Sequence, residues 1–211
     1  MEQSLRFDIL EARITELRVN LLPHEFSSIG EYSPQEQDMA KGFRLLSHAE
    51  FESYLEDVSK DIVMDAVKKW RNDRIPSITI VSFLAAYHSS WSSSNDIHND
   101  EIISLAKNRT NPKDSIMDAV NIALKQFIQK IKSNHGIKAE NFKTLIFPTG
   151  LDVDSIDNNL FIKLDSFGSK RGEIAHNSAK VVNAINPQDE LNEVTELLDA
   201  LRELDGNLIV L

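Results

Sequence analysis

The stretch from Phe43 to Ile75 contains neither glycine nor proline, and this uninterrupted run limits what the chain can fold into. Apolar side chains recur along it at spacings of three and four residues, the period of an α-helix. Such a long helix needs partners along its apolar face, which favours a helical bundle. The pattern predicts one helix of roughly 30 residues or more, or two with a bend near Asp57 or Asp61. Its apolar positions are Met39, Phe43, Leu46, Phe51, Tyr54, Leu55, Val58, Ile62 and Trp70.

Start and stop signals divide the rest of the chain into further helices. Ser33 and Glu36 form a capping box around Pro34, which suits the first position of the long helix. Pro23 ends a preceding helix, and Gly136 is the predicted C-terminal stop of a later one. The other predicted helices cover 2–22, about 77–91, 99–107, 111–136, 138–146, 155–176 and a last stretch from Pro187.

We therefore predict an all-α fold, a mostly antiparallel helical bundle with about four or five core helices and additional helices around them. The 211 residues suit a single domain that buries a sizeable core. Within that domain we expect an N-terminal helix in 1–32, the long helix and an insertion in 33–110, and the remaining helices in 111–211.

Composition and charge narrow the possible classes of function. The formal net charge of −10 argues against broad coating of nucleic acid, but it leaves room for RNA contact at one local cluster. The chain has no cysteine, which excludes disulfides and thiolate chemistry and suits a cytoplasmic protein. We expect no signal peptide, because the N-terminus carries acidic residues and no long apolar run. No stretch is apolar enough for a membrane-spanning helix, so no membrane association is expected.

An arginine interrupts the apolar stripe of the predicted helix 155–176. Ile156, Leu160, Leu164 and Phe167 repeat with helical period, and the next position of the stripe is Arg171. A guanidinium there must be paired, or face a cleft or an interface between subunits, because a lone buried charge is costly. The alternative is an arginine at the rim of the bundle, with its stem packed and its charged head in water.

His176 follows Arg171 by five residues, which on a straight helix is about 140° around the axis and about 7.5 Å along it. The two side chains of one chain therefore diverge unless the helix ends near Ala175. Alternatively, two copies of the chain bring their arginines and histidines together across a two-fold axis. A histidine that merely caps the helix end is the structural alternative.

The sequence "RGEIAHNS" from Arg171 onward resembles the R-x4-H signature of the HEPN superfamily. Two longer segments also resemble prokaryotic HEPN ribonuclease-type domains of the RiboL-PSP and MAE-like branch. "KGFRLLSHAEFESYLE" (41–56) is similar to their long early helix, and "PTGLDVDSIDNNLFIKLDSFGSKRGEIAHNS" (148–178) to the penultimate helix that leads into the motif. The resemblance covers about 40–190.

This resemblance implies a homodimer whose paired motifs line a cleft, with Arg171 and His176 in the catalytic positions. It implies a metal-independent endoribonuclease without cofactors, which acts as a toxin of a toxin–antitoxin pair or in antiviral defence. RNA would be the substrate, and a cognate antitoxin or the product of a neighbouring gene would regulate it. Histidine would move protons, arginine would hold phosphate, and the products would carry 2′,3′-cyclic phosphate and 5′-hydroxyl ends.

Several nearby residues are candidates for supporting roles. The chain departs from the family at Gly172, where members often carry a polar side chain, and Glu173 is the candidate substitute. Asn177 could orient His176 or contact ribose. Further candidates are Lys170 and Lys180 for phosphate steering, and Glu52 for projecting into the site, with a solvated helix surface as the alternative for Glu52.

Other residues point away from alternative chemistries. His48 fits a core or rim histidine. Glu50, like Glu52, could project into the site, with a charge on a helix surface as the simpler interpretation. Asp96, His98 and Asp100 alternate in a polar loop, where solvation is the simpler interpretation, so we expect no metal site. Two other functions stay open: a non-catalytic HEPN-like module that binds a partner protein or nucleotide, and a structural helical bundle.

Overall fold

The computed structural model describes residues 3–87, 112–176 and 184–211, with the backbone alone for 112–115 and 176. Within these ranges all regular secondary structure is helical, which confirms the all-α prediction. None of the helices in these ranges is long and apolar enough to cross a membrane. The α-helices are α1 (Leu5–Leu21), α2 (Pro34–Asp73), α3 (Ile78–Tyr87), α5 (Pro112–Lys132), α6 (Ala139–Ile146), α7 (Asn158–His176) and α8 (Pro187–Leu208). Two short 3₁₀ helices, Phe147–Thr149 and Val153–Ser155, connect α6 to α7.

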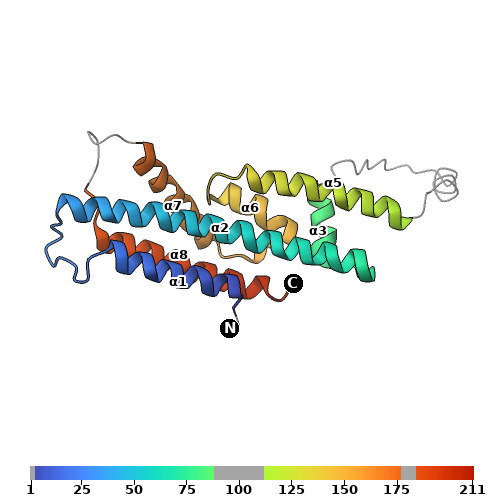
Figure 1. Cartoon of the computed structure of the whole chain (residues 1–211), viewed down its shortest axis with the longest axis horizontal. Helices are drawn as coiled ribbons and strands as arrows, with labels where there is room; N and C mark the ends of the chain where they lie inside the picture. Colours follow the sequence, from blue (N-terminus) through green and yellow to red (C-terminus); the bar gives the residue numbers. More distant parts are fainter. Residues whose placement is uncertain (1–2, 88–111, 177–183) are drawn as a thin grey trace.

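The helix α2 runs along the length of the molecule as one element of 40 residues (Figure 1). It passes Asp57 and Asp61 without a break, so the single-helix alternative is the correct one. The predicted capping box is present: Glu36 N–H donates to Ser33 Oγ at 3.3 Å, and Ser33 N–H donates to Glu36 Oε2 at 2.8 Å. Arg74 ends the helix in the left-handed region, at φ 58°.

Two hydrophobic clusters lie along α2. The first joins the N-terminal half of α2 to α1, α6, α7 and α8, and the second joins its C-terminal half to α3 and α5. Figure 1 shows α1 and α8 beside one half of α2 and α5 beside the other. Each large apolar side chain that is fully buried contributes about 1.5–3 kcal/mol to the free energy of folding, relative to the same side chain left exposed. The fully buried aromatic side chains are Phe7, Phe43, Phe51, Tyr54, Phe142 and Phe167 in the first cluster, and Phe83 and Phe127 in the second.

The predicted apolar stripes agree with the buried faces at most positions. In α1 the buried residues are Phe7, Leu10, Ile14 and Leu17, and in α8 they include Val194, Leu198, Leu201 and Leu208. The prediction was wrong at Leu46 of α2, which is 44% exposed, because the adjacent Ser47 takes the buried position instead.

The structure defines the C-terminal ends of α5 and α1, for which the sequence predicted stops at Gly136 and Pro23. Helix α5 ends at Lys132, so the predicted stop at Gly136 was wrong. Asn134 closes this end instead, through an N–H bond to the Ile131 carbonyl and a side-chain bond to the Gly136 carbonyl. At α1 the residue before Pro23 is extended, as proline requires, and the helix stops at Leu21. The predicted helix 99–107 lies outside the described residues.

Candidate functional site

Arg171 occupies the position of α7 that the sequence pattern assigns to it. Leu160, Leu164 and Phe167 are buried, and Arg171, one turn after Phe167, is half-buried. Within the described ranges no carboxylate oxygen lies within 4 Å of its guanidinium, whereas many other arginines of the chain are paired. Arg171 is therefore a cation that the described part of the fold holds at its surface without neutralising it.

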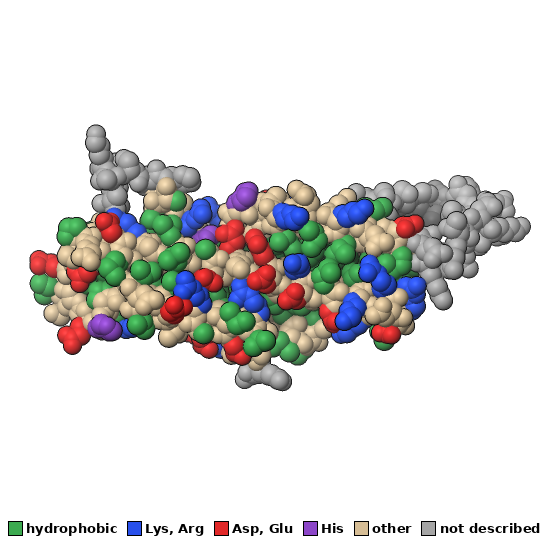
Figure 2. Space-filling view, in the orientation of Figure 1, with side chains coloured by type: hydrophobic (Ala, Val, Ile, Leu, Met, Phe, Trp, Pro, Cys, Tyr) green, Lys and Arg blue, Asp and Glu red, His purple; other side chains and the backbone are tan. Residues whose placement is uncertain are grey.

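The side of α2 beneath Arg171 carries His48 and Glu52. Phe167 stacks on the His48 ring, with centroids 6.2 Å apart and planes 8° from parallel, and meets Phe51 edge-on at 5.5 Å. The positive charge of Arg171 acts on both His48 and Glu52. In Figure 2 acidic side chains gather over the middle of α2, with basic and histidine side chains next to them. The charge of Arg171 therefore reaches Glu52, one of the residues given above as candidates for a supporting role.

His48 is a neutral residue of the core rather than of the rim. His48 is only 2% exposed. Its burial lowers the pKa of the imidazole to about 4, with smaller contributions from the charges of Arg171 and Arg44. Its Nδ1 lies 3.7 Å from Glu52 Oε2, a contact that is not an ion pair while the ring is neutral. Sequence reasoning did not assign His48 to the site, although Arg44, His48, Phe51 and Leu55 share one helical face.

The buried imidazole makes the stability of the fold sensitive to acid. The pKa of His48 falls from about 6.5 unfolded to about 4 folded, so the unfolded chain binds more protons between these values. The stability that the neutral, buried imidazole of His48 contributes is fully present above pH 6.5 and is lost as the pH falls through 4. We expect a loss of about 3 kcal/mol over this window, measured by urea denaturation. In His48→Gln the loss of unfolding free energy that is due to His48 should disappear. If the unfolding free energy of this variant depended on pH as in the wild type, the lowered pKa of His48 would not be its cause.

Glu52 is held in place by a hydrogen-bonded asparagine from the end of α5. Asn134 Nδ2 donates to Glu56 Oε1 at 2.7 Å and to Glu52 Oε1 at 3.4 Å, and Asn134 Oδ1 accepts from Asn141 of α6 at 2.8 Å. Burial and the neighbouring Glu56 raise the pKa of Glu52, against the opposing charges of Arg171 and His135. Glu50, the other acidic candidate, turns away and pairs with Arg13 of α1.

A buried ion-pair network joins α7 to α8 beside the site. The Arg44 guanidinium is fully buried, bonds Glu190 and Glu193 at 2.5 Å each, and lies 4.1 Å from the centroid of Phe167. Lys170, the predicted phosphate-steering residue, pairs with the same Glu193. Burial opposes ionisation of Glu193, but Lys170 and Arg44 hold its pKa below the usual range. The network fixes the turn of α7 that carries Arg171.

The motif itself ends α7. The helix continues through His176, so the backbone gives no earlier helix end at Ala175. Glu173 is exposed, and a Cβ at Gly172 would meet nothing within 4 Å among the described residues, so packing against these residues does not require a glycine. At Gly168 a Cβ would lie 2.9 Å from Lys138 Cγ, so a larger residue there would displace that side chain. Asn177, Lys180 and the side chain of His176 lie outside the described part of the structure.

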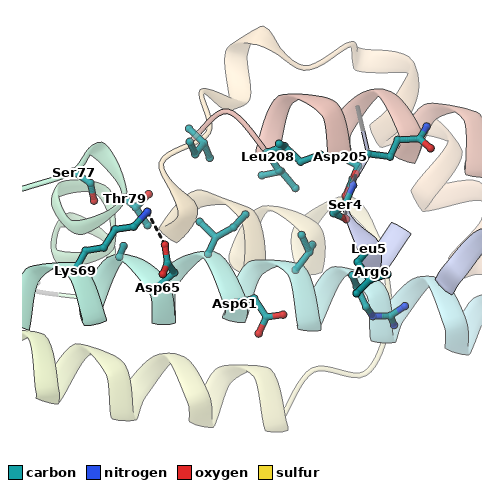
Figure 3. A pocket seen from close by; sticks show the side chains of 16 residues that line it. Ser4, Leu5, Arg6, Asp61, Asp65, Lys69, Ser77, Thr79, Asp205 and Leu208 are labelled. Atoms are coloured by element: carbon teal, nitrogen blue, oxygen red, sulfur yellow. Dashed lines mark hydrogen bonds and ion pairs between the residues drawn. The ribbon is translucent and has the colours of Figure 1, made fainter. Parts of the chain in front are cut away.

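A separate pocket of about 540 Å³ lies between α1, α2, α3 and the end of α8 (Figure 3). It contains none of the motif residues. Asp65 and Lys69 form an ion pair of 2.7 Å on its α2 side, and Asp205 of α8 also lines it. Asp205 accepts hydrogen bonds from Ser4 and Tyr54, which tie the start of α1 to α8. No lining residue of the pocket belongs to the candidate site.

Within the described ranges no three His, Asp or Glu side chains are grouped to hold a metal ion, and Asp96, His98 and Asp100 lie outside those ranges. The model of the RiboL-PSP-HEPN family matches residues 8–206, nearly the whole chain. Comparisons with curated proteins and with solved structures gave no significant match. Because the family model spans all the helices described above, the chain belongs to the RiboL-PSP-HEPN family.

Proposed function

We propose that this protein is a metal-independent endoribonuclease of HEPN type, with Arg171 and His176 in its site. Family membership supports a nuclease or an RNA-binding module. The observation that carries the nuclease proposal is Arg171 itself. It is a half-buried cation in an apolar stripe, and no carboxylate of the described residues neutralises it. An arginine held in this way is suited to bind a phosphate with two parallel hydrogen bonds.

The chemistry needs no group from outside the chain. RNA supplies the nucleophile, its 2′-hydroxyl, and the enzyme must move one proton from that oxygen and one to the leaving 5′-oxygen. The arginine balances the charge of the crowded phosphorane, which is the largest effect in reactions of this kind. Histidine is the side chain whose ordinary pKa lies near neutrality, so a histidine at position 176 suits one of the proton transfers.

We propose that the active form is a homodimer. Helix α7 includes both Arg171 and His176, and five helical residues separate two side chains by about 140°. Because the two positions of one copy lie about 140° apart around the helix, a two-fold axis would allow the arginine of one copy to join the histidine of the other. The acidic chain, with a net charge of −10, suits a basic regulator, and we propose a cognate antitoxin or neighbouring-gene product in a toxin or antiviral defence system.

The test is cleavage of single-stranded RNA by the purified protein in EDTA. We expect cleavage that survives chelation and leaves 2′,3′-cyclic phosphate and 5′-hydroxyl ends, identified by end-specific labelling and mass spectrometry. The same RNA with 2′-deoxy or 2′-O-methyl riboses should remain intact, because it lacks the nucleophile. RNA that stays intact but binds tightly would instead favour the non-catalytic HEPN-like module.

A further inference from the structure

The proposed reaction requires two proton transfers, and the described residues supply a second group for them. We propose that Glu52 accepts the proton of the 2′-hydroxyl, an inference that rests on the proposed nuclease function. His176 then acts as the acid for the leaving oxygen. This role belongs to a carboxylate that feels the charge of Arg171 but forms no ion pair with it among the described residues.

The charge of Arg171 reaches both His48 and Glu52. Phe167, one turn before Arg171 on α7, stacks on His48, one turn before Glu52 on α2, so this stacked pair connects the two turns. The carboxylate is partly fixed: one oxygen lies 3.4 Å from Asn134 Nδ2, and the other lies 3.7 Å from His48 Nδ1. Its side chain is 20% exposed, so it is positioned but open to a substrate.

The neighbouring candidates fit the role less well. The His48 side chain is only 3% exposed, which closes it to a phosphodiester, and its pKa of about 4 makes it a weak base. Glu50 is paired with Arg13 on the α1 side. Glu56 lies one further turn from His48 and accepts the shorter bond from Asn134, at 2.7 Å. Glu52 therefore combines exposure, orientation and proximity to Arg171.

The charges around Glu52 come from three elements. His48 and Glu56 flank it on α2, Arg171 faces it from α7, and His135 faces it from the connection between α5 and α6. Burial and Glu56 raise the pKa of Glu52, and Arg171 and His135 oppose them. A carboxylate whose pKa is raised toward neutrality is a better base than an ordinary one, provided that it remains ionised at the working pH.

The proposed step balances without any other reactant. The 2′-oxygen gives its proton to Glu52 and forms a bond to phosphorus, while the bond from phosphorus to the 5′-oxygen breaks. The 5′-oxygen takes a proton from the His176 imidazolium. Glu52 must be ionised and His176 protonated, so the pH profile of the rate should be bell-shaped, with Glu52 setting its acidic side.

The experiment measures kcat and KM for RNA across pH in EDTA, with the wild-type chain and three variants. Glu52→Gln should lower kcat about 100- to 1000-fold and remove the acidic side of the profile. Its KM should stay the same or fall, because a negative charge near the phosphate is lost. Glu52→Asp should recover part of the loss. Glu56→Gln should move the acidic side to lower pH, because it removes one cause of the raised pKa of Glu52. The maximum rate should fall only slightly, because a less basic carboxylate is a somewhat weaker base.

The outcomes separate this inference from the proposed function. If the wild type and Glu52→Gln cleave equally well with the same profile, the role of Glu52 is overturned while the nuclease stands. If the wild type does not cleave RNA at all, both fail. Should Glu52→Gln not fold, as judged by circular dichroism, Glu56→Gln decides: an acidic side that does not move overturns the inference.

Discussion

Replacing Arg171 by alanine should lower kcat/KM for RNA cleavage by about 100- to 1000-fold, the usual cost of removing one group that stabilises transition-state charge. Arg171→Lys should recover little, because an ammonium cannot reproduce two parallel hydrogen bonds to phosphate. Folding should not suffer, since Arg171 has no carboxylate partner within the described residues. Arg171→Leu should even raise stability in urea, because it restores the apolar stripe that begins at Leu160 and continues through Phe167.

Matched controls come from a second arginine and histidine in the same chain. Arg18 and His24 lie at and beyond the end of α1, with Pro23 between them, so they form no motif. Arg18→Ala and His24→Ala should cleave RNA at the wild-type rate, whereas His176→Ala should be as impaired as Arg171→Ala. If Arg171→Ala retained full activity with wild-type stability, the motif arginine would have no catalytic role, and the nuclease proposal would lose its main support.

Replacing Arg44 by alanine should cost about 3–5 kcal/mol of unfolding free energy, because it leaves buried carboxylates without their counter-ion. Arg44 is fully buried, and the side chain of its partner Glu190 is only 9% exposed. The substitution also removes the guanidinium that packs on Phe167. Urea or thermal denaturation followed by circular dichroism measures the loss.

The control for this effect is an exposed arginine pair. Arg13, whose side chain is 38% exposed, pairs with Glu16 and Glu50, and Arg13→Ala should cost far less unfolding free energy than Arg44→Ala. The double variant Arg44→Met with Glu190→Gln should recover part of the loss, because it removes the stranded charge as well. A loss for Arg44→Ala as small as that for Arg13→Ala would show that the buried network contributes little.

The helices could be predicted because their signals are local. The capping box at Ser33, the proline at the start of α8 and the unbroken period along α2 each act within a few residues. Arg171 could be singled out for the same reason, as the one charge in the stripe that runs from Ile156 to Ile174. Where local signals competed, the prediction failed: Asn134 rather than Gly136 closes the end of α5.

The surroundings of Arg171 could not be predicted, because they depend on contacts between distant segments. Nothing in the sequence near Arg44 indicates that its carboxylate partners lie in α8, 146 and 149 residues away. The sequence also could not separate Glu50 from Glu52, although two helical residues place them about 200° apart. The fold turns one toward α1 and the other toward α5 and α7, so the side facing the motif was decided by tertiary packing.

Both hydrophobic clusters are built on a single uninterrupted rod, α2, and this has a consequence for how the molecule melts. Helix α2 has no break between the two hydrophobic clusters. We therefore expect that the smaller cluster, with α3 and α5, does not unfold independently by bending or separating at a hinge in α2. Partial unfolding of α5 would also displace Asn134, which follows this helix and contacts the carboxylate of Glu52. The stability of the smaller cluster is thus linked to the position of a residue that we propose acts on RNA.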